Sequence, residues 1–466
     1  MINMILRLAL GLADTVIESM RLEGGDLVLG VRPHKRRQRR CPVCGRKGDY
    51  YDMGPAPRRW RASDIARLIC HLEYRPARVR CPEHGVHVEQ VPWARHKARF
   101  TRDFEDRVAW MAVHCTAKAT AAECRIEWHT VGGICRRVYD ELLAAGGPDR
   151  YAGLRRIGID ETSYRKGQKY ITVVVDHDLG CVVWAAEGYG KEVLDAFFKE
   201  LTPWQRQQIE LASADGAKWI KALVKKRCKN ARVVMDPFHV VSWMNDALDG
   251  VRRDEWRVAK AAADAAVPKR SRPGRPSKGD ETPPEAKALR ELADEMRGSR
   301  YALLKRPEDL TDKQREALAR VEQAGSHLFK AWELKEDLRA VFRAETAGDA
   351  RALLDDWLYR ASYCRIPRVV KVEQKVRKRR EDIIAAVECG ISNAAVEAIN
   401  NKIKVTIKMA YGFRNTDNMI SLIMLRCSSV TPQLPGHKPE PTAGERKAAA
   451  DEKRAKNKAK RKENAA

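Results

Sequence analysis

Residues 154–178 constrain the fold of this chain more than any other stretch. Apolar residues alternate with glycine and acid up to Asp160, and residues 171–175 are all β-branched, so the stretch predicts two strands joined by a turn at Gly167. The first strand ends in a carboxylate, Asp160. A carboxylate there is costly unless it is hydrogen-bonded, paired with a cation such as Arg155, or bound to a metal ion. The strand alone favours ion pairing over metal binding.

Composition limits the partners of the chain. Its 466 residues, 44% of them apolar, are enough for several domains with buried cores. A net charge of +26 favours nucleic acid as the partner, with an anionic membrane surface as the alternative. No stretch predicts a membrane span, and Arg7 and Asp14 interrupt the N-terminal apolar segment too early for a signal peptide. We therefore expect a cytoplasmic protein with no membrane partner, whose twelve cysteines are reduced thiols or metal ligands.

Two short motifs of one design predict a metal site. Cys41-Pro-Val-Cys44-Gly is followed about forty residues later by Cys81-Pro-Glu-His84-Gly. Two such turns can bring their ligands together tetrahedrally around one structural zinc ion. Cys70, His71 and His87 are alternatives for the fourth ligand. Small modules of this kind seldom fold without metal, so the expected role is structural rather than catalytic.

Residues 100–145 predict a helix-turn-helix outline. Thr101 can cap a first helix, a shorter helix follows near residues 117–124, and Trp128, Val131 and Val138 keep helical spacing in a third. Any small three-helix bundle shares this outline. Beside a basic zinc module it favours DNA binding, with the third helix as the candidate reader.

The order of elements after the opening hairpin predicts a ribonuclease H-like domain. A third strand at 180–187, a helix at 193–201, a short strand at 209–214, a helix at 219–227 and a strand at 231–235 follow in turn. In that topology the first and fourth strands are neighbours, so Asp160 and Asp215 end close together. Two ionised carboxylates side by side need divalent cations, and Mg²⁺ suits oxygen ligands and phosphoryl chemistry.

A third acid is expected from a later helix. Ser392 or Asn393 can cap a helix whose stripe Val396, Ile399 and Ile403 is apolar. Glu397 lies on a neighbouring face, and Asn401, Lys404 and Lys408 continue that face as candidate DNA contacts. An ordinary solvated face is the alternative.

Several blocks together resemble the DDE transposases of bacterial insertion sequences, specifically the ISL3 family with its N-terminal zinc ribbon. These blocks are residues 157–178, Asp215 with its glycine, 233–241, 392–404 and 410–415. The resemblance runs from the zinc module to about Cys427. It implies a core that binds two Mg²⁺ ions, acts on double-stranded DNA at the ends of a mobile element and at its target, and works as a homodimer associated with the bacterial nucleoid.

The resemblance identifies the first aspartate and the glutamate of the site, but it leaves two candidates for the second aspartate. Asp160 matches the first aspartate, and Glu397, within Asn-x-x-x-Glu-x-x-Asn-Asn-Lys, matches the glutamate. The second aspartate is either Asp215, at the end of the fourth strand, or Asp236, at the end of the fifth. We favour Asp215, because Asp236 and His239 form an Asp-x-x-His pair like the auxiliary element of related transposases.

The expected fold class is therefore α/β, a ribonuclease H-like core with a large helical insertion, preceded by a zinc module and a helix-turn-helix domain. Residues 268–284 are linker-like, and Arg272 and Arg275 within them resemble an AT-hook that inserts arginines into a minor groove. The expected divisions are the hairpin and zinc module (1–98), the helix-turn-helix domain (99–150), the core (151–241 and 390–430), the insertion (242–389) and a basic disordered tail (431–466).

Two other functions share this fold. A nuclease that cleaves without transposing would have the same acids, and a DNA-binding regulator could be built on a transposase core that is no longer catalytic. Retention of three candidate acids argues against the regulator.

Overall fold

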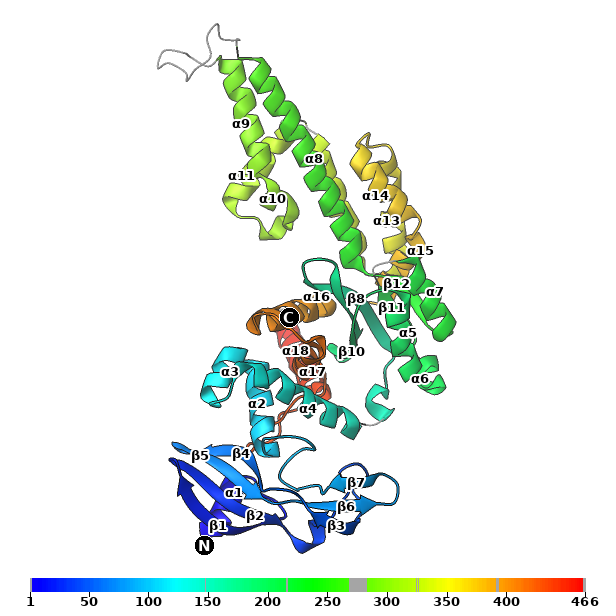
Figure 1. Cartoon of the computed structure of the whole chain (residues 1–466). Helices are drawn as coiled ribbons and strands as arrows, with labels where there is room; N and C mark the ends of the chain where they lie inside the picture. The colour runs from blue at the N-terminus through cyan, green and yellow to red at the C-terminus, as the bar shows by residue number, and fades with distance from the viewer. Residues whose placement is uncertain are drawn as a thin grey trace, which may run out of the picture. The chain divides into compact units, whose positions relative to one another are not determined.

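The computed structural model describes residues 2–146, 148–214, 217–267, 283–323, 325, 327–390 and 394–463. The chain forms two compact units (Figure 1), and its mixed α/β structure agrees with the fold class predicted from the sequence. Unit 1 contains Met1–Leu154, Glu161–Phe197 and Val396–Ala466, and unit 2 contains Arg155–Asp160 and Phe198–Ala395. Within these described residues, no helix has both the length and the apolar character that crossing a membrane requires.

Unit 1 begins with helix α1 (Ile2–Ala9) and a four-stranded sheet in the order β1-β2-β5-β4. Its strands are β1 (Thr15–Glu23), β2 (Asp26–Pro33), β4 (Arg58–Ile65) and β5 (Leu68–Tyr74). The first hairpin turns at Gly24 and Gly25, both with positive φ, because a two-residue turn between right-twisted strands needs that conformation. A smaller sheet of β3 (Asp49–Met53), β6 (Ala77–Cys81) and β7 (Gly85–Val88) accompanies the cysteine motifs.

Three helices follow, and they confirm the predicted helix-turn-helix outline. They are α2 (Arg102–His114), α3 (Ala117–Glu123) and α4 (Trp128–Gly146). Thr101 caps α2 by accepting a hydrogen bond from the backbone N–H of Phe104 at 3.3 Å, and Thr116 caps α3 in the same way. Their apolar faces meet in one core that also takes in Leu422 and Leu425 of a helix near the C-terminus.

A buried carboxylate joins these helices. Glu105 of α2 is fully buried, and it accepts hydrogen bonds from Arg137 of α4 at 2.8 Å and from Arg95 at 3.2 Å. Burial raises the pKa of Glu105, and the two guanidinium groups act against that shift. The carboxylate is tolerated because cations satisfy it.

The central sheet has five strands in the order β10-β9-β8-β11-β12. They are β8 (Arg156–Arg165), β9 (Lys169–Asp176), β10 (Cys181–Glu187), β11 (Leu211–Ala214) and β12 (Arg232–Met235). The first three form an antiparallel meander, whereas β11 lies parallel to both β8 and β12. The prediction that the first and fourth strands are neighbours is therefore confirmed.

The parallel pairing requires a crossover, and α5 (Lys191–Glu200) and α6 (Pro203–Gln208) provide it. Thr202 and Gln205 form a capping box at the start of α6. A second crossover, α7 (Lys218–Arg227), connects β11 to β12.

Helices pack on this sheet within each unit. In unit 1, α16 (Ala394–Met409) and α17 (Thr416–Cys427) bury Ile399, Ile403 and Ile423 against Ile171 and Val173 of β9. In unit 2, Ala385 and Ala386 of α15 (Arg380–Glu388) cover Leu211 and Val234. These contacts follow the apolar stripes in the sequence.

The segment between β12 and α16 is helical, as expected for the insertion. Its helices are α8 (Pro237–Ala265), α9 (Pro284–Gly298), α10 (Arg300–Leu304), α11 (Asp312–Gln323), α12 (His327–Val341), α13 (Ala347–Ser362), α14 (Pro367–Arg377) and α15. They share a core around fully buried Trp357 that also includes Met235 of β12. The predicted linker with Arg272 and Arg275 lies almost wholly outside the described residues.

The C-terminal segment differs from the prediction of a disordered tail. Residues Ala443–Glu463 form helix α18. Before it, Trp110 of α2 donates a hydrogen bond from its indole Nε1 to Glu440 at 2.8 Å. Alanine, lysine and glutamate favour helices as well as solvation, so the composition alone did not separate the two states.

The Glu105 cluster gives a test of this packing. We expect Arg137→Met to lower the free energy of unfolding by about 2–3 kcal/mol, because it leaves a buried carboxylate with one cation fewer. The loss should shrink as the pH falls through the raised pKa of Glu105, since a protonated carboxyl no longer needs that cation. Arg136→Met is the matched control and should cost less than about 1 kcal/mol, because Arg136 makes exposed ion pairs. Hydrogen exchange of α2 and α4 amides in urea measures both, and equal losses would contradict the prediction.

Candidate functional site

Asp160 lies midway along β8, at the point where unit 2 ends along that strand. The prediction that the first strand ends at Asp160 is wrong, because the strand continues to Arg165. The strand is buried before it, at Ile157 and Ile159, and Asp160 itself is half-buried. Two residues further on, Thr162 lies on the same face of the strand, because side chains alternate along β structure. Asp160 is thus the first partly exposed residue after the buried stretch at residues 157–159.

The neighbouring strand, β11, is described up to Ala214, and Asp215 lies outside the described residues. The register of the pair is regular: Leu211 lies opposite Arg156, Ala212 opposite Ile157, and Ser213 opposite Gly158. Partners in this ladder are therefore 55 positions apart in the sequence.

Helix α16 carries the third predicted acid. The side chain of Glu397 is outside the described residues, as are the expected caps Ser392 and Asn393. Val396, Ile399 and Ile403 are buried as predicted. Asn401, Lys404 and Lys408 are all exposed, which is what a contact surface for phosphates requires.

One contact from α16 was not foreseen. The hydroxyl of Thr162 donates to Asn400 Oδ1 at 3.2 Å. This bond fixes α16 against the end of β8 within unit 1. The sequence analysis chose Asn401 and missed Asn400, although the apolar stripe of α16 places Asn400 beside the core-facing Ile399 and could have indicated it.

Asp236 has a defined local role. It is the N-cap of α8, and its side chain accepts a hydrogen bond from the backbone N–H of Phe238 at 2.9 Å. Its side chain is almost buried, and Pro237 occupies the first helical position. His239 Nε2 stands 3.9 Å from Asp236 Oδ2, which is too far for a hydrogen bond.

The structure brings Cys41, Cys44, Cys81 and His84 together. One ligand atom from each lies within 4.8 Å of all the others. Cys44 Sγ is 3.7 Å from Cys81 Sγ, and His84 Nδ1 is 3.5 Å from Cys81 Sγ and 3.9 Å from Cys41 Sγ. The ring of His84 holds the pKa of the Cys81 thiol below its usual value. Glycines with positive φ, Gly45 and Gly85, close both turns.

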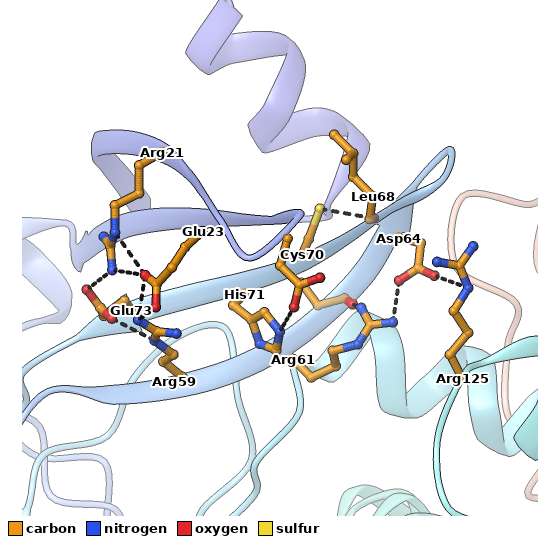
Figure 2. Close-up of polar contacts among 12 residues, drawn as sticks. Arg21, Glu23, Arg59, Arg61, Asp64, Leu68, Cys70, His71, Glu73 and Arg125 are labelled. Atoms are coloured by element: carbon orange, nitrogen blue, oxygen red, sulfur yellow. Dashed lines mark hydrogen bonds and ion pairs between the residues drawn. The ribbon is translucent and has the colours of Figure 1, made fainter.

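The alternative fourth ligands are engaged elsewhere. His87 Nε2 contacts the backbone carbonyl of His84 at 2.6 Å. Cys70 and His71 belong to β5 in the four-stranded sheet, where Cys70 Sγ faces the carbonyl of Leu68 at 3.8 Å and His71 pairs with Asp26 at 3.2 Å (Figure 2). Among the described residues, the cluster with His84 is the only group of three or more Cys, His, Asp or Glu side chains with metal-binding spacing.

Comparison with known families decides the identity of the chain. Residues 157–423, more than half of it, match the ISL3 family of DDE proteins described as transposases, and residues 89–139 match the helix-turn-helix domain of transposase family ISL3. The chain belongs to the ISL3 transposase family. It is 42% identical over 433 residues to a transposase for insertion sequence element IS1557 from Mycobacterium tuberculosis, covering 92% of this chain and 96% of that one.

A more distant relative agrees with this assignment. A transposase for insertion sequence element IS1001 from Bordetella parapertussis is 25% identical over 353 residues, which cover 75% of this chain and 79% of that protein. This ISL3 family member is thus a DNA transposase, and its helix-turn-helix domain makes it a DNA-binding protein.

The predicted reader helix of the transposase is only partly accessible. Trp128 and His129, at the start of α4, are exposed. Further along, a Cβ added at Gly132 would lie 2.8 Å from the side-chain nitrogen of Asn418 of α17. The first turn of α4 therefore remains available for DNA, whereas Gly132 permits α17 to approach the next turn closely.

The helix-turn-helix domain is also fixed to the N-terminal sheet. Arg125, in the turn between α3 and α4, pairs with Asp64 of β4 at 3.4 Å (Figure 2). It also donates to the carbonyl of Arg67 at 3.0 Å. On the same sheet, Arg59 and Arg21 both pair with Glu73. The sheet thus supports the turn of the DNA-binding domain.

The capping role of Asp236 can be tested by stability alone. We expect Asp236→Ala to lower the free energy of unfolding by about 1 kcal/mol, whereas Asp236→Asn should keep it, because asparagine caps as well as aspartate. Asp246→Ala, at an exposed position of the same helix, is the control and should change stability by less than about 0.5 kcal/mol. Urea denaturation measures all three variants. A destabilised Asn variant would mean that the charge of Asp236 has another role.

Proposed function

We propose that the transposase cleaves the ends of its element and joins them to target DNA through a pair of Mg²⁺ ions held by Asp160, Asp215 and Glu397 in a ribonuclease H-like core. The parallel pairing of β8 with β11 is the observation that carries the proposal. The donors are carboxylate oxygens, the ligand type that Mg²⁺ prefers. No cysteine or histidine is needed in this set.

The register supports Asp215 as the second acid. Facing residues of β8 and β11 are 55 positions apart, and so are Asp160 and Asp215. Asp236 follows β12, which is one strand further from β8, or roughly 10 Å away across two strand spacings. One of its oxygens is also committed to capping α8. Both observations favour Asp215 over Asp236.

The contact between Thr162 and Asn400 supports Glu397 as the third acid. Thr162 follows Asp160 by two residues on one face of β8, and Asn400 follows Glu397 by one helical turn of α16. Strand β8 and helix α16 therefore contact each other just beyond Asp160 and Glu397, respectively. This contact favours a short distance between the two acids.

When bound, the two Mg²⁺ ions would activate a water or 3′-hydroxyl nucleophile and stabilise the leaving oxygen of an in-line displacement. The protein's own part is to orient the three carboxylates and to hold the DNA backbone. The exposed side chains of Asn401, Lys404 and Lys408 are placed to contact phosphates along α16. The proposal includes a homodimer on DNA, because joining requires two element ends to be held together.

We expect Asp160→Asn, Asp215→Asn and Glu397→Gln each to lower the rate of Mg²⁺-dependent cleavage by at least about a thousandfold, because each removes a metal ligand. Asp236→Asn is the matched control and should retain cleavage. The measurement is nicking and joining of a plasmid that carries the element ends. Full strand transfer by Asp160→Asn would refute the site, and cleavage without joining by the unmodified protein would indicate a nuclease.

We further propose that Cys41, Cys44, Cys81 and His84 bind one structural zinc ion. Tetrahedral zinc with Zn–S distances of ~2.3 Å separates two sulfurs by roughly 3.8 Å and a sulfur from a histidine nitrogen by roughly 3.6 Å. The separations of 3.7 Å between Cys44 and Cys81 and of 3.5 Å between Cys81 and His84 agree with these values. The cluster therefore has the spacing of a closed, four-ligand site.

Native mass spectrometry tests the zinc proposal. We expect one zinc per chain in the unmodified protein and none in Cys81→Ser, because three remaining ligands bind zinc far more weakly. Cys70→Ser should keep its zinc, since Cys70 lies in the neighbouring sheet and outside the cluster. Zinc retained by Cys81→Ser, or lost from Cys70→Ser, would show that the ligand set is wrong.

A further inference from the structure

A cavity of about 790 Å³ lies within unit 1, beside the turn that connects α16 to α17. Its other walls are the end of α2, the starts of α3 and α4, the last residues of β8, and one face of α17. Its volume falls in the range of small-molecule sites, which is ~300–1,000 Å³. Asp160, the one proposed catalytic acid whose side chain is among the described residues, does not line it.

The turn beside the cavity has a strained conformation. Helix α16 ends in a Schellman motif, with Tyr411 N–H bonded to Lys408 O at 3.0 Å and Gly412 N–H bonded to Ile407 O at 3.3 Å. Tyr411 occupies the position that glycine prefers, with φ of +54°. A non-glycine residue there costs roughly 1 kcal/mol. Tyr411 as a whole is 78% exposed, so burial of its side chain does little to offset that cost. Strain of this kind often marks a functional position.

The lining combines rings with cations. Trp128, Tyr164, Tyr411 and Phe413 contribute aromatic rings, and Lys118, Arg165 and Arg414 contribute positive charge. No aspartate or glutamate is among the described residues that line the cavity. Aromatic faces bind nucleobases by stacking, and arginines bind phosphates. A neutral apolar ligand would not need the cations, and a cationic ligand would be repelled.

We propose that this cavity receives an unstacked nucleobase from the end of the element, with Trp128 and Tyr411 stacking on the base and Arg165 and Arg414 holding the adjoining phosphates. The proposal deepens the proposed function, since it assigns a second DNA site to the same chain. Tyr164 lies four residues beyond Asp160 on β8, or ~13 Å along the strand. Thr406 lies nine residues beyond Glu397 on α16, or ~13.5 Å along the helix. Both lengths correspond to a few nucleotides of DNA.

The test compares three duplexes of one sequence, one blunt, one with a short single-stranded extension, and one whose extension has abasic sugars. Fluorescence anisotropy measures the affinity of the full-length transposase for each, with Mg²⁺ omitted so that cleavage does not contribute. We expect the extension with bases to bind about tenfold more tightly than the abasic extension, because only the former can stack. The abasic extension keeps the phosphates, so it isolates the contribution of the base.

Tyr411→Ala should remove most of that tenfold preference and leave binding of the blunt duplex within about twofold. Tyr411→Phe should keep the preference, because it keeps the ring. Tyr301→Ala, at an exposed tyrosine of α10, is the matched control and should change neither affinity. Melting curves check that each variant is folded, and Tyr411→Gly, which relieves the positive φ, replaces Tyr411→Ala should that variant fail to fold.

Equal affinity for the two extended duplexes would overturn the proposal, and so would an equal loss on all three duplexes in Tyr411→Ala. If a segment of a second copy fills the cavity instead, Tyr411→Ala would change the mass measured by light scattering without changing the base preference. Loss of cleavage in the Asp160 variant does not affect this result, because binding is measured without Mg²⁺. Failure of the metal site and failure of the base site are thereby distinguished.

Discussion

The parallel pairing of β8 with β11 is the constraint on which the catalytic half of the transposase depends. Parallel neighbours cannot be joined by a tight turn, so the chain must cross over through α5 and α6 before β11 begins. The crossover makes both strands run in the same direction, with residues 55 positions apart in the sequence facing each other. Residues far apart in the sequence on these two strands are then neighbours by geometry alone. No local propensity near Asp160 could create such a pair.

The helix that carries Glu397 is fixed by the sheet rather than by the insertion that precedes it. Ile399 and Ile403 are buried against Ile171 and Val173 of β9, and Asn400 is bonded to Thr162 of β8. The helices from α8 to α15 pack around Trp357 in a core that they share with Met235 of β12. The insertion can therefore vary in length and surface without changing which face of α16 meets the sheet, because that face is chosen by its apolar stripe.

Local signals made much of this fold predictable. Alternating apolar residues indicate the strands, and Thr202 with Gln205 indicates a capping box. The repeated cysteine motif indicates three of the four proposed zinc ligands. The fourth ligand was not decidable from spacing, because His84 and His87 lie three residues apart and only folding turns His87 toward a carbonyl. The bond between Trp110 and Glu440 spans 330 positions and leaves no local pattern. Long-range contacts of this type are set by packing, which a single sequence does not display.

Tyr411, at the end of α16, occupies a position that the sequence pattern of a helix end does not predict for a tyrosine. Tyr-Gly after a helix reads as an ordinary stop, since glycine is expected just past the last turn. The structure places the tyrosine, not the glycine, at the first left-handed position. Glycine at both positions would be less strained, and no buried contact of the ring offsets the difference, because the ring is exposed beside a cavity rich in cations. The stability of the fold therefore does not explain a tyrosine at position 411. A nucleobase that stacks on its ring, as we propose, explains it.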